Sequence, residues 1–145
     1  GELNDDNRAM NSANSGINIL VIDDDPAMTD LLKMILEQDK AQVVTANRGS
    51  DGVAFFKSDK FQMVIVDLMM PEMDGCEVTR ALRQLSNVPI LMVSALDNPG
   101  LIARALNAGA DDFLIKPFTH SILAARINML TRRRVTKPLY SHAVL

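Results

Sequence analysis

Charged residues stand at the ends of apolar segments in a pattern that could build one chemical site. Asp67 and the pair Asp23 and Asp24 each follow a run of four apolar residues, and Lys116 follows a run of three. If these runs are buried parallel strands, their carboxyl ends meet at one edge of a sheet, where open α/β sheets place their ligands. Carboxylates that outnumber the nearby cations need a metal ion, and oxygen ligands favour Mg²⁺.

The composition indicates one globular domain in a reducing compartment. The chain has 145 residues, of which 48% are hydrophobic and 23% charged, with a net charge of −3. That charge gives no reason to expect nucleic-acid binding. The single cysteine, Cys76, excludes an internal disulfide, and we expect it to be a buried packing residue. No apolar stretch approaches the roughly 20 residues of a membrane helix, and the polar N-terminus is unlike a signal peptide, so a cytoplasmic location is expected.

Strand-like and helix-like segments alternate along the chain. Strands are expected at 17–22, 42–46, 63–66, 88–94 and 112–115. Helices are expected to begin near Pro26, Gly49, Gly75 and Pro99 and after Thr119. Most of the strand segments are continuously apolar, as expected when both faces of a sheet are covered. Five strand–helix units predict an α/β fold, a doubly wound parallel sheet with right-handed crossovers.

The ends and faces of the helices carry further signals. Asp25 is expected to cap the first helix, in which Pro26 is the first residue. Gly109 is expected to end the fourth helix, and Thr119 to cap the last. The residues expected to form the apolar faces of the first and last helices are Met28, Leu31, Leu32, Ile35, Leu36, Ile122, Leu123, Ile127 and Leu130.

The two ends of the chain have compositions unlike the middle. Residues 1–16 are rich in Asn, Ser, Asp and Gly, which predicts a disordered lead. The last helix is expected to end at Arg132, Arg133 and Arg134, where cations suit the helix dipole; a contact surface for acidic partners is the alternative. Residues 135–145 are interpreted as a linker or tail.

Three segments together resemble a known family. They are ILVIDDDP at 19–26, DLMMPEMDG at 67–75 and GADDFLIKPF at 109–118. In this order and spacing they resemble the receiver domain of response regulators in two-component signalling, over residues 17–134. The resemblance implies a CheY-like, flavodoxin-like fold: a doubly wound five-stranded parallel sheet of order 2-1-3-4-5 with five helices.

The resemblance also implies a role for each residue of the acidic site. Asp67 matches the aspartate that accepts a phosphoryl group from a histidine kinase. Asp67 and Asp24 would be ligands of Mg²⁺, as would Met69 through its backbone carbonyl, and Asp23 would act through a metal-bound water. Lys116 would reach the phosphoryl oxygens, from a peptide bond to Pro117 that is usually cis in this family.

Two further positions match the switch of the family. Ser94 ends the fourth strand, and its hydroxyl would donate to a phosphoryl oxygen. Phe113 matches an aromatic residue that moves inward with it; the family often has Tyr here, so Phe implies a steric readout. Such a domain is not a conventional enzyme, since it promotes its own phosphorylation and dephosphorylation. Met69 and Leu96 stand where the family tunes hydrolysis, and neither can orient water, which predicts a long-lived phosphate.

The resemblance implies protein partners, and neither a membrane nor direct nucleic-acid binding. Phosphate would come from a histidine kinase or phosphotransfer protein. The face of the fourth helix, fifth strand and fifth helix would then control an output domain or partner. Some receiver domains of transcription factors form homodimers through this face, and the resemblance implies the same arrangement as one alternative here. The charged residues that suit one are Asp111, Asp112, Arg104 and Arg126, whereas Ile102 and Ile122 stand where related dimers often carry a charged pair.

Other classes fit less well. A haloacid-dehalogenase hydrolase needs a second Asp two residues after the first, where this chain has Met69. A flavodoxin-type cofactor module needs a phosphate-cradling loop, and Asp23 and its acidic neighbours would repel phosphate unless a metal intervened. A receiver that works without phosphorylation is a further alternative, and the presence of all the residues that the family uses for phosphorylation argues against it. The isolated His120 and His142 are read as surface residues, and the Met-rich run lacks the Cys or His expected of a soft-metal site.

Overall fold

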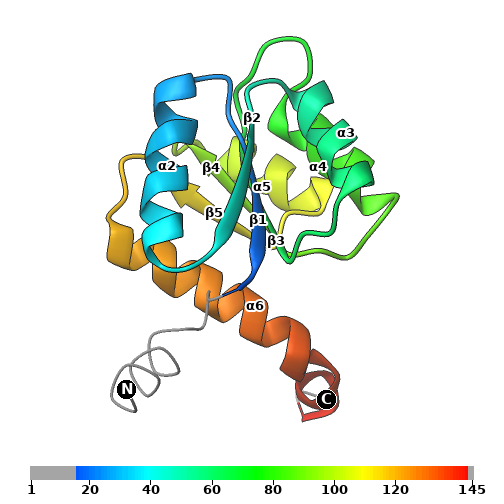
Figure 1. Cartoon of the computed structure of the whole chain (residues 1–145). Coiled ribbons are helices and arrows are strands. Elements are labelled where there is room, and N and C mark those ends of the chain that lie inside the picture. The colour runs from blue at the N-terminus through cyan, green and yellow to red at the C-terminus, as the bar shows by residue number, and fades with distance from the viewer. Residues whose placement is uncertain (1–15, 144–145) are drawn as a thin grey trace, which may run out of the picture.

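The computed structural model describes the backbone of residues 16–143 and the side chains of residues 16–132. Within that range five strands and five helices alternate (Figure 1). The strands are β1 (Asn18–Ile22), β2 (Gln42–Ala46), β3 (Met63–Asp67), β4 (Ile90–Ser94) and β5 (Asp112–Ile115). The helices are α2 (Pro26–Gln38), α3 (Gly49–Ser58), α4 (Gly75–Arg83), α5 (Pro99–Ala108) and α6 (His120–Ala143). All five expected strands and all five expected helices are therefore present.

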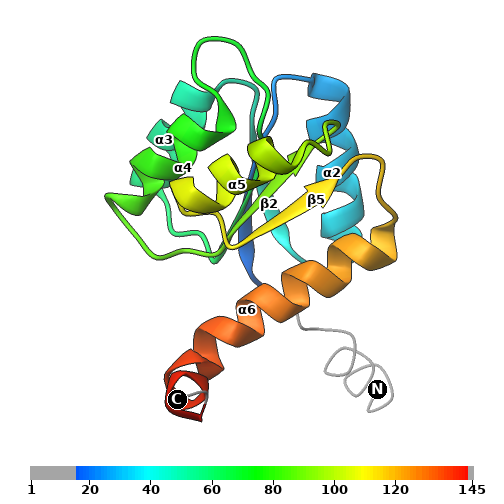
Figure 2. The ribbon, with the colours of Figure 1, turned by 180° about the vertical axis from the view of Figure 1, so that it is seen from behind.

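The strands form one parallel sheet in the order β2-β1-β3-β4-β5. Figures 1 and 2 show α2 and the start of α6 on one face of it and α3, α4 and α5 on the other. Successive strand residues point to opposite faces. Ile19 and Val21 therefore pack with α2 and α6, and Leu20 and Ile22 with the other three helices. The doubly wound fold predicted from the sequence is confirmed.

Close packing fixes where the chain leaves the sheet. A Cβ at Gly75 would collide with the carbonyl oxygen of Asp67, so the start of α4 lies directly against the end of β3. The side chain of Asp74 accepts a hydrogen bond from the N–H of Glu77 at 2.9 Å, and the Glu77 carboxylate accepts one from the N–H of Asp74. This capping box holds the helix start and, with it, the loop that follows Asp67.

Three of the expected helix caps are confirmed. Asp25 accepts a hydrogen bond from the N–H of Ala27 at 3.0 Å, directly before Pro26. Gly109 ends α5 with φ of 117°, a left-handed conformation that favours glycine. The hydroxyl of Thr119 accepts a hydrogen bond from the N–H of Ile122 at 3.2 Å at the start of α6.

Cys76 is fully buried, as expected of a packing residue, and burial raises the pKa of its thiol.

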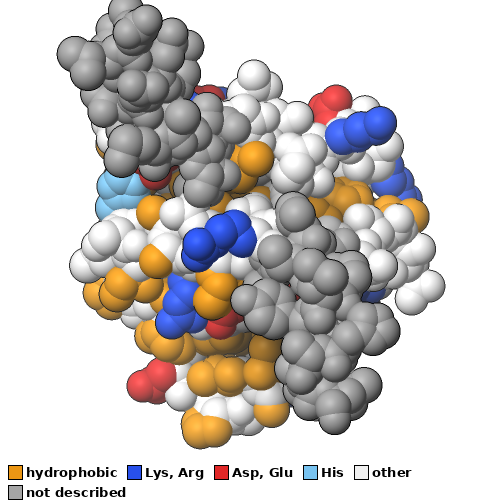
Figure 3. All heavy atoms as spheres, turned by 90° about the horizontal axis from the view of Figure 1, so that it is seen from below, with side chains coloured by type: hydrophobic (Ala, Val, Ile, Leu, Met, Phe, Trp, Pro, Cys, Tyr) orange, Lys and Arg blue, Asp and Glu red, His pale blue; other side chains and the backbone are white. Residues whose placement is uncertain are grey.

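Three expectations about the helices are wrong. Leu31 is 44% exposed and Ile122 is 45% exposed, because only about one face of each helix can touch the sheet, and Leu32 and Leu123 occupy it. Figure 3 shows hydrophobic side chains, with cationic ones among them, on the surface seen from below. Helix α6 also continues past Arg134 to Ala143 and includes Pro138. Residues 132–137 contain no glycine or proline, so nothing in that stretch ends the helix at Arg134.

Some expectations concern residues that the structure does not describe. The predicted disordered lead lies in 1–15, apart from Gly16, and the side chain of His142 is also outside the described residues. His120 lies on the surface, as expected, and its Nε2 is 2.8 Å from Asp39 Oδ2. Among the described helices, none has the length and hydropathy needed to cross a bilayer.

Candidate functional site

Three carboxylates from two strand ends meet at one edge of the sheet. The register pairs Ile22 with Val66, so the residues that follow them, Asp23 and Asp67, lie side by side. Oxygens of these two carboxylates and of Asp24 all lie within 4.8 Å of one another. Asp23 is 1% exposed and Asp67 is 7% exposed, whereas Asp24 faces solvent. Two of the three acids are therefore buried, and the cluster is open to solvent at Asp24.

Lys116 reaches this cluster from the other half of the sheet. Its Nζ lies 2.8 Å from Asp23 Oδ2 and 3.6 Å from Asp67 Oδ2. Its backbone N–H donates to the carbonyl of Ser94 at 2.8 Å, which fixes the start of the side chain at the end of β4. The bond between Lys116 and Pro117 is cis, as expected. The structure thus brings the four charged residues named from the sequence into one group.

Burial and like charge both act on the Asp67 carboxylate. Burial, helped by the neighbouring charge of Asp23, raises the pKa of Asp67 to about 6 from its ordinary value of 3.8. The ammonium of Lys116 and the backbone N–H of Met69 oppose that rise but do not cancel it. Near neutral pH Asp67 is therefore charged but poorly solvated, which suits a nucleophile that gains from a nearby cation.

The ammonium group is strongly held. Burial lowers the pKa of Lys116, but its hydrogen bond to Asp23 and the charges of Asp67 and Asp23 outweigh burial, so the pKa lies above its ordinary value. Lys116 consequently stays protonated at any physiological pH. Three carboxylates against one ammonium still leave an excess of two negative charges at a site where two of the three acids are buried.

The donor set of the cluster fits Mg²⁺. The oxygens are hard ligands, the excess charge is negative, and the exposed Asp24 leaves a path for a hydrated ion. Asp25 contributes no ligand atom to this cluster; its side chain caps α2, and its N–H donates to Asp23 Oδ1 at 3.0 Å. The Met69 side chain points into solvent, and its N–H holds the Asp67 carboxylate.

One supporting residue escaped the sequence analysis. Asn47 follows β2, and its amide donates to the carbonyl of Asp23 at 2.9 Å and to the hydroxyl of Thr29 at 3.0 Å. It therefore fixes the backbone that carries Asp23 against the buried Thr29 in the first turn of α2. The rule that strand ends meet at one edge applies to β2 as well, and it would have found this residue.

The two residues matched to the family's switch lie on neighbouring strands. Ser94 ends β4 and is fully buried, and its Oγ accepts a hydrogen bond from the N–H of Leu96 at 3.1 Å. Phe113, on β5, is half-buried and packs against the apolar cluster under α3, α4 and α5. Ser94 therefore lies at the strand end next to the acidic cluster, and Phe113 belongs to β5 on the face of α5, β5 and α6.

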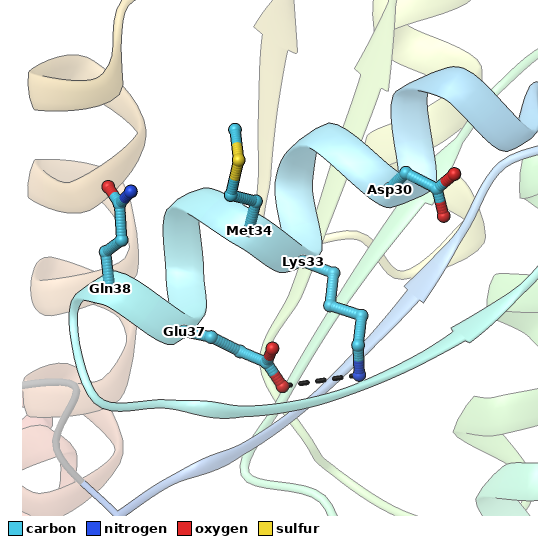
Figure 4. Close-up of a pocket in the computed structure, with 5 residues that line it drawn as sticks. All are labelled: Asp30, Lys33, Met34, Glu37 and Gln38. Carbon is cyan, nitrogen blue, oxygen red and sulfur yellow. Dashed lines mark ion pairs between the residues drawn. The ribbon is translucent and has the colours of Figure 1, made fainter.

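A separate hollow lies on the outer side of α2 (Figure 4). Its lining residues all come from that helix, and the Nζ of Lys33 pairs there with Glu37 Oε2 at 3.3 Å. None of its lining residues belongs to the acidic cluster. This hollow is therefore separate from the acidic cluster at the strand ends.

Comparison with known proteins agrees with the geometry. The family model described as "Response regulator receiver domain" matches residues 19–128. A "Probable transcriptional regulator ycf27" of Porphyridium aerugineum is 39% identical over 115 residues, which cover 79% of this chain and 48% of that protein. The "DNA-binding response regulator MtrA" of Mycolicibacterium smegmatis is 35% identical over 120 residues, covering 83% and 53%.

Solved structures show the same fold. The chemotaxis protein CheY4 of Vibrio cholerae superimposes with a TM-score of 0.77 at 27% identity, over 80% of this chain and 99% of that one. A CheY-like receiver domain protein of Methanospirillum hungatei gives a TM-score of 0.80 at 28% identity, over 85% and 99%. This chain spans about half the length of the curated relatives it matches. It belongs to the receiver domain family of two-component response regulators.

Proposed function

We propose that this domain acts in the cytoplasm as a phosphorylation switch, with Asp67 as the acceptor and Mg²⁺ as the cofactor. A histidine kinase or phosphotransfer protein would supply the phosphoryl group. The observation that carries the proposal is the group of charges at the strand ends. It comprises a buried carboxylate with a raised pKa, an ammonium 3.6 Å away and two further acids within 4.8 Å.

The chemistry is a direct displacement. A carboxylate oxygen of Asp67 forms a bond to phosphorus while the P–N bond of phosphohistidine breaks, and the bonding pair leaves on the imidazole nitrogen. Lys116, already within reach of Asp67, neutralises charge on the phosphoryl oxygens. Asp23, Asp24, Asp67 and the Met69 carbonyl would hold Mg²⁺. When bound, the ion would offset the negative charge of the acids and of the phosphoryl group.

The phosphoryl group would then be sensed through Ser94. The Oγ of Ser94 already accepts a hydrogen bond from Leu96, so its own proton is available to a phosphoryl oxygen. Turning the hydroxyl toward Asp67 draws the loop at 95–98 inward and frees space for Phe113 to move further into the core. The face of α5, β5 and α6 would carry this change to an output domain or partner. The curated relatives are about twice as long as this chain and are described as a transcriptional regulator and a DNA-binding response regulator, which supports an output domain as the target.

Mass spectrometry tests the acceptor directly. Incubation with acetyl phosphate and Mg²⁺ should add one phosphoryl group to the wild-type protein and none to Asp67→Asn. Asp59→Asn, which changes an exposed acid after α3, should still be modified. Equal modification of Asp67→Asn would refute Asp67 as the acceptor. Modification of the wild-type protein in the presence of a chelator would show that the reaction does not need Mg²⁺.

We also predict that the aspartyl phosphate is long-lived. The exposed side chains of Met69 and Leu96 are apolar, and neither can hold a water in line with phosphorus. A single hydrogen bond to that water is worth about 1 kcal/mol, so Met69→Asn should speed the decay about fivefold. The decay of phosphorylated protein after removal of the donor measures this. An unchanged rate in Met69→Asn, with Met34→Asn on the outside of α2 as the matched control, would contradict it.

A homodimer through the face of α5, β5 and α6 is the remaining proposal. Leu106 and Ile122 are exposed there, and Arg126 pairs with Asp112 of its own chain at 2.8 Å. With phosphodonor present, Arg126→Ala should weaken dimerisation by removing a charge at the interface, and Ile122→Glu should do so about tenfold or more by placing an unpaired carboxylate there. Sedimentation velocity measures both. Dimerisation unchanged in Arg126→Ala would remove the idea, and Leu85→Glu, outside this face, serves as the control.

A further inference from the structure

Arg83, the last residue of α4, joins three segments at the edge of the sheet opposite the acidic cluster. Its Nε donates to the carbonyl of Gly109 at 2.9 Å, and its Nη1 donates to the carbonyl of Val88 at 2.7 Å. Its Nη2 donates to Asp111 Oδ2 at 2.8 Å, with the arginine side chain only 20% exposed. One guanidinium thus fastens the end of α4 to the start of β4 and to the turn after α5.

The partners of Arg83 are themselves fixed. Asp111 Oδ2 also accepts from the N–H of Ile90 at 2.8 Å, and the N–H of Asp111 donates to the carbonyl of Ile90 at 2.9 Å. A Cβ on Gly109 would come 2.8 Å from Cγ of Arg83, so the arginine stem fills the space beside the turn. Charge-assisted bonds from a planar fork hold geometry better than bonds from a point charge. The C-terminal end of α5 is therefore clamped.

The N-terminal end of α5 has a different environment. Residues 95–100 are all exposed. Apart from the backbone bonds within α5 itself, the hydrogen bonds that the structure shows for 95–100 join them only to residues 94–102. Asn98, for example, caps the helix by accepting from Gly100 and Leu101. The fully buried residues of α5, Ala105 and Ala108, lie in its second half, whereas Leu101 in its first turn is only partly buried against the same core. The helix is thus loosely held beside Ser94 and tightly held beside Arg83.

We propose that Arg83 is the pivot of the output helix: α5 swings about the clamp formed by Arg83, Gly109 and Asp111 while its N-terminal end follows the loop after β4. This deepens the proposed function, since it rests on Ser94 moving that loop. Arg83 is a positioning residue, because it touches neither the acceptor nor any phosphate. A helix fixed at one end converts a small pull near Ser94 into a tilt, whereas a helix loose at both ends would slide or fray.

Hydrogen exchange followed by mass spectrometry tests the pivot. The states compared are wild type alone and wild type with Mg²⁺ and beryllium fluoride, which mimics a phosphoryl group on the acceptor. Exchange at 95–102 should change on activation while exchange at 105–111 stays constant. In Arg83→Lys, which keeps the charge but loses the fork, exchange at 105–111 should rise about tenfold and become sensitive to activation. Arg80→Lys, an exposed arginine on the same helix, should behave as wild type.

Each outcome decides something. If beryllium fluoride protects 67–74 but 105–111 responds as strongly as 95–102 in wild type, the pivot is wrong and the proposed function stands. If Arg83→Lys leaves 105–111 unchanged without activator, the clamp does not hold α5 and the pivot is wrong as well. If beryllium fluoride alters exchange nowhere in wild type, the proposed function fails and the swing fails with it.

Discussion

Replacing Lys116 with methionine should lower the free energy of unfolding by about 3 kcal/mol without divalent cations, because it leaves buried carboxylates unpaired. Asp23, which accepts the 2.8 Å hydrogen bond from Lys116, is almost completely buried and loses its cation. The same change should slow phosphorylation of Asp67 about 100-fold, the usual effect of removing one positioned donor from a transition state. Methionine keeps most of the stem, so lost packing contributes little.

Urea unfolding in the presence of a chelator measures the loss of stability. Mg²⁺ should recover much of it, because a second cation can neutralise the same acids. Lys57→Met, at an exposed position in the last turn of α3, should change stability by less than about 0.5 kcal/mol. If Lys116→Met unfolds at the same urea concentration as wild type without metal, the acids are not held by this lysine.

Replacing Asp67 with asparagine should do the opposite and stabilise the metal-free protein at pH 7.5 by about 2–3 kcal/mol. The pKa of Asp67 is about 6 in the folded chain and 3.8 ordinarily, and one pKa unit corresponds to about 1.4 kcal/mol. Between these two values the folded state binds more protons than the unfolded state, so stability falls as pH rises from about 4 to 6. Above pH 6 the full penalty remains, and asparagine removes it.

The difference in unfolding free energy between Asp67→Asn and wild type, measured from pH 4 to pH 8 with a chelator, isolates this one group. It should be near zero at the acid end and grow through the window from about 4 to 6. Asp59→Asn, in an exposed position, should show no such growth. Mg²⁺ should stabilise the wild type and have a smaller effect on Asp67→Asn, since one ligand charge is gone. If the difference in unfolding free energy stays constant with pH, burial does not raise the pKa of Asp67 in the folded protein.

The two variants can be combined. Asp67 and Lys116 are 3.6 Å apart, so their effects should not add. In the double variant the loss caused by removing the lysine should be smaller than in the wild-type background, since one of the charges it balances has gone. This cycle separates the pairing of Lys116 with Asp67 from its shorter contact with Asp23.

Local signals explain why so much could be predicted from the chain alone. A helix cap forms hydrogen bonds with residues next to it in the sequence, so the adjacent residues are enough to predict it. The caps predicted in this way are Asp25, Gly109 and Thr119. The continuous apolar runs likewise predict buried parallel strands from adjacent residues alone. The place of Asp67 at a strand end follows from its position in the run, without knowledge of its partners.

Other features depend on residues that are distant in sequence, and neighbouring residues carry no signal for them. Which side of α2 or α6 stays in solvent depends on how far each helix overlaps the sheet, and so Leu31 and Ile122 were misjudged. The clamp of Arg83 on Gly109 spans 26 positions, and it leaves no pattern in the intervening sequence.

The amino-acid sequence by itself determined the order of the elements, the caps that bound three of the helices, and the identity of the acids and the lysine at the strand ends. Only the tertiary structure decided that Lys116 lies between Asp23 and Asp67, 93 positions from the first of them, and that burial moves the pKa of Asp67. The physical reason is that propensity and capping act over a few residues, whereas solvation and charge act through space.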